Sequence, residues 1–442
     1  MLGSSLVAAI AVAAGCSGDA APEAQTTPVA TAAPSSMEAS PSMPSTKPPP
    51  AVAPRAPTPE IPLAPNRGGA VLTAPRLVPV TFTGDPMASD IETFVSSLGS
   101  SSYWHDTTAE YGVGAAVAGQ AVHLSEAAPA SIEDAAIKTW LVSRLDGTHA
   151  EWPAPDAQTI YVLYYPAATA ITYEGATSCG GFGGYHSEAA LPGGKSAVYA
   201  VIPRCASYPK AGVDVVGLPL LTVTTSHELV EAATDPHPDT APANFGAGTY
   251  FGLPVAEVEL ADLCVADLQV DPTKFIVPEG LPFTVQRSWS NAAAKGRHDP
   301  CVPAAPTPYF NSAPVPVVAL PDTKAYFSQV LQGWKLPVGQ TTTIDVDLFS
   351  DGPTDGPWSV SVADVTNLDP GAPKYLDLKL DRTSGTNGDK LHLTVTALKD
   401  GLFDIFEVTS KLGSRTAHWY GVVQTGAPPS GPGGAGGATP SP

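Results

Sequence analysis

The sequence has few charged residues, and still fewer basic ones. Charged side chains make up 14% of its 442 residues, against roughly 25% in ordinary soluble domains. The 22 basic residues are outnumbered by 42 acidic residues, and the formal net charge is −20 at pH 7. A field of this sign repels phosphate backbones and anionic lipid, so nucleic acid is not expected as a partner. It suits an extracellular protein, or one that collects cations.

The apolar stretch near the N-terminus is too short to cross a membrane. Residues 6–14 (LVAAIAVAA) have the length of a signal-peptide core, whereas a spanning helix needs about 20 apolar residues. The stretch ends in Ala13-Ala14-Gly15-Cys16, which resembles the lipobox of bacterial lipoproteins. The resemblance implies that the chain is exported, cleaved before Cys16 and lipidated there, with the lipid as its only contact with the membrane. Ser17 after the cysteine implies an outer-membrane or cell-surface destination.

Cysteine is scarce, and no CxxC pair is present, which argues against a zinc site built from cysteines. The chain has five cysteines. Without Cys16 an even number remains, as expected for disulfides in an exported protein. Three pairings are possible, and proximity in the sequence favours Cys179–Cys205 together with Cys264–Cys301.

Proline and glycine, at 48 and 41 residues, are too numerous for ordered elements alone and cluster towards the two ends. Residues 17–69 are rich in Pro, Ala, Ser and Thr and nearly lack aromatics, so we expect a disordered tether after the signal peptide of residues 1–16. Residues 425–442 are expected to form a disordered Gly/Pro tail. Between them we expect two domains, at residues 70–305 and 306–424.

The first domain mixes helix and strand signals. Runs of β-branched and aromatic residues predict strands, and apolar residues at helical spacing predict helices. The predicted strands are 77–82, 160–165 and 197–202, and the predicted helices are 89–98, 131–145, 219–234 and 258–265. A Gly-rich loop, residues 179–186, lies between the last two strands and either turns tightly or lets another group approach the backbone closely.

Beyond residue 306 the pattern changes to alternation of apolar and polar residues. Short alternating runs separated by turn residues predict an all-β, Ig-like sandwich. The runs are 343–349, 358–362, 375–380 and 391–396. His392 and His418 in this region are expected to pack or face solvent. The loop from Asp351 to Asp355 is a weak candidate for calcium.

The residues that carry chemistry lie on the predicted helix 219–234. His227 and Glu231 are four residues apart, so on a helix they share one face and can grip one cation. Glu228 is turned by one residue, where it can take a proton from a metal-bound water. This is the logic of the HExxH helix of zinc metallopeptidases, with HExxE in its place.

A third metal ligand must come from outside this helix. Glu259, on the predicted helix 258–265, offers a carboxylate, and Asp262 one turn later is placed to accept a hydrogen bond from His227 and orient it. The alternative third ligand is His237, ten residues after His227 but flanked by two prolines. We favour Glu259.

A site of this composition has a predictable charge. Two carboxylates and one imidazole neutralise a divalent cation, whereas two imidazoles and one carboxylate leave it cationic. A neutral centre lowers the pKa of its water less, so we expect weak hydrolysis near neutral pH. Oxygen-rich ligation also relaxes the preference for zinc, which remains the expected cofactor.

The segment from His227 to Pro236 (HELVEAATDP), followed by Glu259-Leu-Ala-Asp-Leu-Cys264 and by Trp289-Ser-Asn291 before Cys301, resembles a group of secreted bacterial proteins with a zincin-like HExxE helix. That group is similar to the phosphate-induced, exordium-like family. The likeness covers residues 77–302 and implies an α+β zincin-like domain ahead of the sandwich.

Two further residues become candidates through this resemblance. Cys179 with the following Gly-Tyr-His186 matches the family's Cys-Gly-aromatic-His loop, so His186 is a candidate for the site. Asp235, in Thr234-Asp235-Pro236, matches the family's Thr-Asn-Pro and is a candidate beside the metal. From the residues alone, His186 either joins the site or caps the Gly-rich loop.

Two hypotheses for the function follow. The first is a lipid-anchored metallohydrolase acting on extracellular peptide or protein, with His227, Glu231 and Glu259 as metal ligands and Glu228 as the base. The second is a non-catalytic surface protein that uses the zincin-like domain as a scaffold for binding, because plant members of the family keep the scaffold without the His-Glu pair. The oligomeric state is left open.

Overall fold

The computed structural model describes residues 60–207, 214–240, 244–245, 247–268, 272–327, 329–369 and 371–426. Cys16, the expected signal peptide, the expected tether up to residue 59 and the expected tail from residue 427 lie outside the described residues. Within the described ranges, no helix is both long and apolar enough to cross a bilayer.

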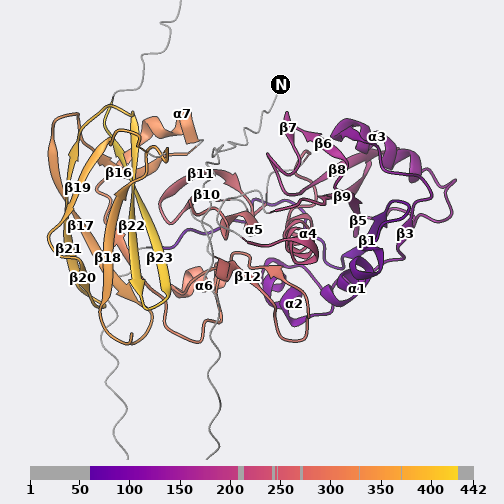
Figure 1. Ribbon diagram of the computed structural model, residues 1–442, viewed down its shortest axis with the longest axis horizontal. Coiled ribbons are helices and arrows are strands. Elements are labelled where there is room, and N and C mark those ends of the chain that lie inside the picture. Colours follow the sequence, from indigo (N-terminus) through magenta and orange to yellow (C-terminus); the bar gives the residue numbers. More distant parts are fainter. Residues whose placement is uncertain are drawn as a thin grey trace, which may run out of the picture. The chain divides into compact units, whose positions relative to one another are not determined.

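A six-stranded sheet organises the first part of the described chain (Figure 1). Its pairings are parallel except that of the last edge strand, β8, which runs antiparallel to its neighbour. In spatial order the strands are β2 (Val117–Ala118), β1 (Arg76–Thr81), β5 (Thr159–Tyr165), β9 (Lys195–Pro203) and β8 (Tyr185–Leu191), and β3 (Val122–His123) also pairs with β1.

Strand β5 explains why this sheet is covered on both faces. All seven of its residues are buried, and successive side chains point to opposite faces. Ile160, Val162 and Tyr164 join the apolar core that includes α4 (Gly217–Thr234). Tyr161 and Leu163 join the core on the other face. A continuous apolar run of this kind is typical of a parallel strand between two layers.

Helices lie on both sides of this sheet (Figure 1). One core contains residues of α1 and α4, and the other contains residues of α3. The helices are α1 (Ala88–Leu98), α2 (Ser102–Thr108), α3 (Asp134–Arg144), α5 (Leu260–Leu263), α6 (Asn291–Gly296) and α7 (Lys324–Phe327), with 3-10 turns η1 (Ala109–Tyr111), η2 (Pro272–Lys274) and η3 (Pro321–Thr323). Three small sheets contain β4 (Ser131–Glu133), β6 (Ala170–Tyr173) and β7 (Ala176–Thr177); β10 (Ala247–Tyr250) and β11 (Leu253–Val258); and β12 (Phe275–Ile276) and β13 (Val285–Gln286).

The elements predicted for this part are largely present, with three corrections. The predicted helix over residues 131–145 begins at Asp134, because Ser131–Glu133 pair with β6 as strand β4. The predicted helix over residues 258–265 is the shorter α5, and Glu259 before it has extended backbone angles. The Gly-rich loop ends at residue 184, and His186 lies in strand β8 instead.

The last part of the chain forms two sheets that share one core, as in a sandwich. One sheet has the order β14-β17-β21-β19 and the other β15-β16-β23-β22-β18-β20, where β16 and β23 pair in parallel and the other pairs are antiparallel. The strands are β14 (Phe310–Pro314), β15 (Val318–Leu320), β16 (Leu331–Lys335), β17 (Thr341–Ser350), β18 (Trp358–Asp364), β19 (Leu376–Leu380), β20 (Ser384–Gly385), β21 (Lys390–Ala397), β22 (Phe403–Leu412) and β23 (Arg415–Gln424). The fold is therefore mixed α/β with a sandwich-like pair of sheets.

The folded part extends beyond both boundaries drawn from composition. Ile61 and Ala64, assigned to the tether, are buried at 5% and 0% exposure in a core that also includes Trp289. Thr425, assigned to the tail, is buried and donates a hydrogen bond to Asp404. Composition could not reveal these contacts, because small and polar residues are held here by partners distant in sequence.

The two predicted disulfides, Cys179–Cys205 and Cys264–Cys301, are confirmed. The first ties the Gly-rich loop before β8 to the segment after β9. The second ties the residue after α5 to the segment after α6. Each disulfide therefore holds a segment that neighbours the candidate site described next.

Candidate metal centre

Helix α4 is buried on nearly every side, yet it carries three ionisable residues in sequence positions 227–231. Leu229, Val230, Ala232 and Ala233 are all fully buried in the core. Glu228 and Glu231 are also buried, at 4% and 3% exposure, respectively. Buried carboxylates are costly unless they are paired or bind a cation. The buried carboxylates of α4 therefore indicate a binding site on this helix.

His227 presents one ring nitrogen to a group of carboxylates. Its Nε2 lies 3.1 Å from Glu231 Oε2, 3.4 Å from Asp262 Oδ1 and 4.0 Å from Glu228 Oε1. Its Nδ1 lies 3.2 Å from Gln286 Oε1, and the Gln286 amide is itself fixed because its Nε2 donates to the Ala261 carbonyl at 2.8 Å. With Nδ1–H donating to Gln286, the Nε2 lone pair faces the carboxylates, which is the usual orientation of a metal-binding histidine.

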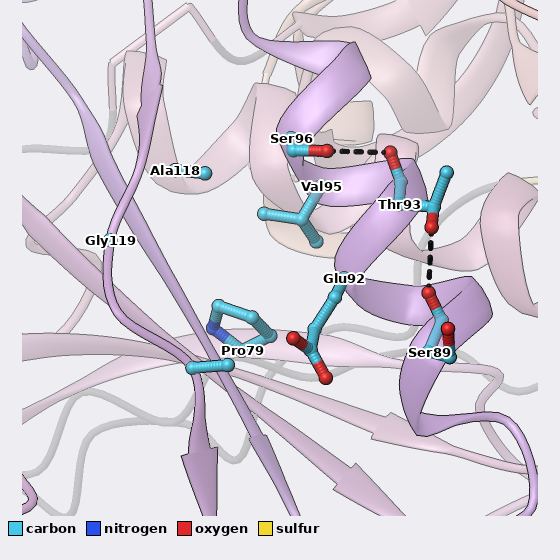
Figure 2. Close-up of a pocket in the computed structure, with 9 residues that line it drawn as sticks. Pro79, Ser89, Glu92, Thr93, Val95, Ser96, Ala118 and Gly119 are labelled. Carbon is cyan, nitrogen blue, oxygen red and sulfur yellow. Dashed lines mark hydrogen bonds between the residues drawn. The ribbon is translucent and has the colours of Figure 1, made fainter.

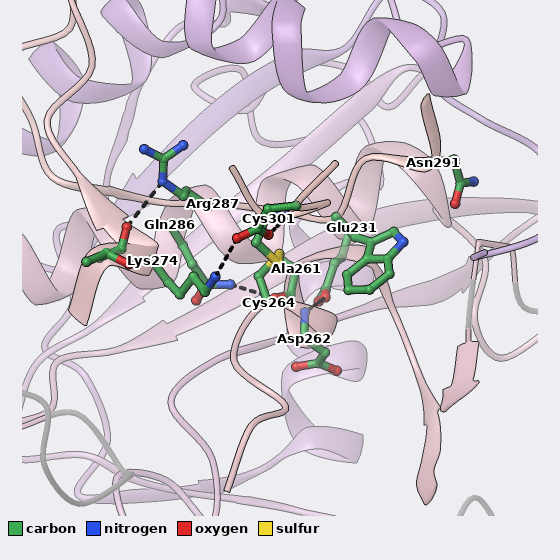
Figure 3. Close-up of a disulfide and its surroundings, with 12 residues drawn as sticks. Glu231, Ala261, Asp262, Cys264, Lys274, Gln286, Arg287, Asn291 and Cys301 are labelled. Carbon is green, nitrogen blue, oxygen red and sulfur yellow. Dashed lines mark hydrogen bonds and ion pairs between the residues drawn. A yellow bond between two sulfur atoms is a disulfide. The ribbon is translucent and has the colours of Figure 1, made fainter. Parts of the chain in front are cut away.

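Asp262 and Glu231 are joined directly. Glu231 Oε1 accepts a hydrogen bond of 3.1 Å from the backbone N–H of Asp262, which leaves Oε2 facing His227. Figure 3 shows these residues beside the Cys264–Cys301 disulfide, with Gln286 on the neighbouring segment. The disulfide therefore anchors α5, and with it Asp262, next to α4.

His186 enters the cluster from strand β8. Its Nε2 donates to the Asp235 carbonyl at 3.0 Å, its Nδ1 lies 3.8 Å from Glu228 Oε2, and its Nε2 lies 3.8 Å from Glu259 Oε1. The Oε1 atom of Glu259 is buried and has no hydrogen-bond partner among the described residues. His186 therefore lies close to Glu228, and Glu228 lies between the two histidines.

Two sets of three side chains are close enough to hold a cation around α4. His227, Glu231 and Asp262 form one set, and His186, Glu228 and Glu231 form the other. Asp262, which we expected to orient His227 or to serve as an alternative ligand, stands among the ligand candidates. Glu259, the favoured third ligand, lies beside His186 instead.

The remaining candidates have other partners. His237 Nδ1 lies 2.9 Å from Glu188 Oε2, away from the two ligand sets. Asp235 Oδ2 accepts from the Asn244 backbone N–H at 3.0 Å. In the calcium candidate loop, Asp351 accepts from His298 Nδ1 at 2.6 Å and from the Tyr309 backbone N–H at 2.9 Å, so both its oxygens serve packing contacts.

Burial is the largest influence on the carboxyl groups of the cluster. It raises the pKa of Glu228, and it raises the pKa of Glu259 well above its usual range. Burial and then the charge of Glu231 raise the pKa of Asp262 to about 7. Glu231 is the exception: burial acts to raise its pKa, but the charge and hydrogen bond of His227 outweigh it and the pKa is lowered.

The histidines respond in the opposite sense. Burial acts to lower the pKa of His186, but Glu259 and Glu228 outweigh it and raise the pKa to about 10. Burial likewise acts to lower the pKa of His227, and Glu231 raises it well above its usual range. Without a cation, the cluster therefore balances its charge by holding protons, which a cation would displace.

Two residues of the site carry no motif in the sequence. Gln286 orients His227, but nothing in the sequence marks it apart from its place in a short β-like run. Gly184 packs against Glu228: a Cβ at this glycine would lie 2.7 Å from Glu228 Oε1 and 2.7 Å from Thr224 Cγ2. In the sequence, this close contact is indicated only by the high glycine content of the loop. At residue 184 a glycine is needed because the Glu228 carboxylate approaches the backbone closely.

A separate hollow lies between α1 and strands β1 and β2, lined by Pro79, Glu92 and Gly119 among others (Figure 2). Its hydrogen bonds, from the Thr93 hydroxyl to the Ser89 carbonyl and from the Ser96 hydroxyl to the Thr93 carbonyl, are internal to α1. Glu92 is the sole ionisable residue of its lining. The hollow shares no residue with the cluster around α4 and offers no ligand set.

Comparison with known proteins gives no family. No family model matches the chain, and no curated protein matches it in sequence. Among solved structures, domains 4 and 5 of the S-layer protein SbsC match 26% of this chain and 54% of that chain, with 18% identity and a TM-score of 0.16. The titin M3 domain matches 21% of this chain and 86% of that chain, with 13% identity and a TM-score of 0.16.

A third match is a Bacteroides ovatus GH5 xyloglucanase, over 26% of this chain and 20% of that chain, with 16% identity and a TM-score of 0.15. The chain spans about half the length of the S-layer structure that it matches. At these TM-scores the matches carry no argument about fold or activity. The functional case therefore depends on the geometry around α4.

Proposed function

We propose that the protein is an extracytoplasmic, zincin-like metallohydrolase that acts on peptide or protein, with an Ig-like sandwich as its second domain. The observation that carries the proposal is the environment of His227. One nitrogen faces the carboxylates of Glu231 and Asp262 at 3.1 and 3.4 Å, while Gln286 fixes the other. The amide of Gln286 fixes one ring nitrogen, and the other ring nitrogen points towards two carboxylates. This arrangement suits a divalent cation.

The donor atoms are spaced closely enough to serve as ligands of one cation. Ligands about 2.0–2.2 Å from a zinc ion lie on the order of 3.4 Å apart at tetrahedral angles. The two distances from His227 Nε2 to Glu231 and Asp262, 3.1 and 3.4 Å, lie at or slightly below that separation. His227, Glu231 and Asp262 would hold the cation, with zinc as the first candidate and manganese compatible with the oxygen-rich set.

A bound cation would polarise a substrate carbonyl and make a nearby water more acidic. The protein's own side chains supply the proton transfers. Glu228 Oε1 faces the same side as His227 Nε2, at 4.0 Å, where it can accept the water's proton. Burial raises the pKa of Glu228, which keeps the acquired proton available for the leaving group. Asp262, whose side chain is 44% exposed, marks the side from which substrate can enter.

The competing function is a non-catalytic binding protein on the cell surface. The observation that favours it is the donor set, because carboxylates outnumber imidazoles around the cation and leave it with little positive charge. Such a centre would stabilise the fold and promote hydrolysis weakly. The two functions differ in what Glu228 does.

Metal content and activity of matched variants test the proposal. Purified full-length protein should contain bound zinc or manganese by elemental analysis, and His227→Ala should lower that content. Glu228→Gln should keep the cation at the His227 set yet lose at least about a hundredfold in peptide hydrolysis, since a general base contributes on the order of 10²–10⁴-fold. His105→Ala, on an exposed residue, is the control and should match wild type. A metal-free wild type, or full activity in Glu228→Gln, would defeat the hydrolase.

Export and anchoring are proposed on separate grounds. The two disulfides support an oxidising compartment outside the cytoplasm. Lipid attachment at Cys16 is proposed from the lipobox alone. Partition of the expressed full-length protein into detergent, lost in Cys16→Ser, is the expected result, and equal partition of the two would contradict the anchor.

A further inference from the structure

The cluster around α4 contains more ligands than one cation uses. Six ionisable side chains meet there, and their three-membered ligand sets overlap in one residue, Glu231. The first set takes its histidine from α4, and the second takes its histidine from β8. The six are His186, His227, Glu228, Glu231, Glu259 and Asp262.

We infer that the protein binds two divalent cations side by side, one at His227, Glu231 and Asp262 and one at His186, Glu228 and Glu231, with Glu231 shared between them. The inference rests on the proposed function, because it takes the first cation on α4 as given. The inference adds a second ion to the proposed function and assigns His186 and Glu228 to that ion.

The distance between His186 and Glu228 in the second set resembles that between two ligands of one ion. His186 Nδ1 lies 3.8 Å from Glu228 Oε2, whereas His186 Nε2 is occupied because it donates to the Asp235 carbonyl at 3.0 Å. The Nδ1–Oε2 separation is too long for a hydrogen bond. It falls within the range of about 3.0–4.2 Å expected for two ligands that each stand about 2.1 Å from one cation.

Glu228 has the side-chain geometry of a residue between two ions. Oε1 faces His227 at 4.0 Å and Oε2 faces His186 at 3.8 Å. Among the described residues no hydrogen bond within 3.5 Å reaches this carboxylate, although it is only 4% exposed. With Oε2 on the second ion, Oε1 still faces the first ion's histidine.

The charge of the cluster is compatible with two cations. Glu228, Glu231, Glu259 and Asp262 together carry four negative charges when ionised, and among the described residues no lysine or arginine is ion-paired with them. One divalent cation leaves half of that charge to be balanced by protons on the histidines and carboxyl groups, whereas two cations cancel it without protons.

The buried Oε1 of Glu259 adds an independent observation. It has no hydrogen-bond partner among the described residues and is aimed at His186. An ionised oxygen in that state needs a cation or a proton. Glu259 belongs to neither ligand set, so its oxygen adds negative charge beside His186 without serving as a further ligand. Such paired sites have ions on the order of 3.5–4 Å apart and take manganese, zinc or iron.

Stoichiometry separates this inference from the proposed function. Full-length protein is stripped with a chelator, loaded with Zn²⁺ or, separately, with Mn²⁺, dialysed, and analysed for metal per chain. Two ions are expected in wild type and one in His186→Ala, with circular dichroism to verify folding. His186→Gln serves as a second, isosteric variant. The matched control is His123→Ala, an exposed histidine paired with Glu92, which should retain both ions.

Electron paramagnetic resonance gives a readout independent of counting. The Mn²⁺-loaded wild type should give the spectrum of an exchange-coupled pair, and the His186 variants that of an isolated ion. One ion in wild type overturns the inference and leaves the proposed function standing, whereas no ion overturns both. Two ions in His186→Ala, or two uncoupled ions in wild type, place the second ion elsewhere and also overturn the inference.

Discussion

Gln286 decides which nitrogen of His227 faces the carboxylates. It is 1% exposed, its amide oxygen accepts from His227 Nδ1, and its amide nitrogen donates to the Ala261 carbonyl. A buried amide fixed at both ends holds the imidazole in one tautomer. The spacing of His227 and Glu231 was readable in the sequence because it is local to one helix. The orienting partner was not, because it is 59 residues away.

Gly184 provides a test of how closely the site is packed. In Gly184→Ala the new methyl would lie 2.7 Å from Glu228 Oε1, so the carboxylate must move. We expect peptide hydrolysis to fall on the order of a hundredfold, because a base displaced by about 1 Å loses that much. Gly180→Ala is the matched control, since its nearest contact is at 4.0 Å. Equal rates of peptide hydrolysis for the two variants would show that hydrolysis does not depend on the position of the Glu228 carboxylate.

Asp404 should make stability depend on pH. Burial raises its pKa from 3.8 to about 6, and its Oδ1 has no hydrogen-bond partner among the described residues. The folded state therefore holds this proton more tightly than the unfolded state, so the contribution to stability is present below about pH 4 and is lost as pH rises through about 6. The free energy of unfolding of Asp404→Asn, relative to wild type, should rise over this window in urea titrations. A constant difference would contradict the assignment.

The start of helix α5 places the two acidic candidates for the third ligand beside different histidines. A helix over residues 258–265 would put Glu259 and Asp262 on one face, three residues apart. In the structure Glu259 has extended angles, φ −83° and ψ −175°, and helix begins only at Leu260. Glu259 is thereby directed to His186, and Asp262 alone faces His227. Helix ends are difficult to predict from sequence to within one or two residues. Here the exact start of α5 decides which histidine Glu259 faces.

The Cys264–Cys301 disulfide should matter for both stability and metal binding. It closes a loop of 37 residues, and removing it as Cys264→Ser/Cys301→Ser should cost about 3–4 kcal/mol of unfolding free energy. Affinity for the first cation should also fall, because Asp262 lies two residues from Cys264. The matched control is Cys179→Ser/Cys205→Ser, which opens a loop of 26 residues. It should lose similar stability and keep that cation; equal affinities in the two variants would contradict the anchoring role.

Elements with strong local patterns could be predicted, and those set by distant partners could not. The all-buried strand β5, helix α4 and the alternating strands β17, β18, β19 and β21 were predicted to within a few residues. Ser131–Glu133 were predicted helical and are strand, because β6 offers them a partner. His186 was assigned to a loop and lies in β8, because pairing with β9 extends the strand to it.

At the scale of the whole molecule, the sandwich shares a core with the part that carries the site. The ring of Phe251 packs at a tilt against the rings of Trp289 and Trp419, with centroid distances of 5.5 and 5.3 Å, and all three belong to one apolar cluster. Tyr420 donates to Asp267, and its oxygen also lies 3.1 Å from Glu407 Oε1. The residues of the two expected domains meet through contacts as far as 153 residues apart in sequence, which local sequence patterns do not reveal.

Tyr420 tests that shared interface. Tyr420→Phe removes a hydroxyl between two buried carboxylates and should lower the free energy of unfolding by about 1–3 kcal/mol in denaturant titrations. His418, which pairs with Glu407 at 2.7 Å, remains in place. The control is Tyr326→Phe at a side chain that is 47% exposed, where little change is expected. Equal stability of the two variants would mean that the contact contributes nothing.

The most direct test of the central claim, that α4 carries a metal centre, is anomalous X-ray scattering at the zinc edge from crystals of the zinc-loaded protein. We expect a peak within about 2.0–2.2 Å of His227 Nε2 and of oxygens from Glu231 and Asp262. The same map from His227→Ala should lose it. A zinc-loaded wild-type crystal with no anomalous peak beside α4 would contradict the claim.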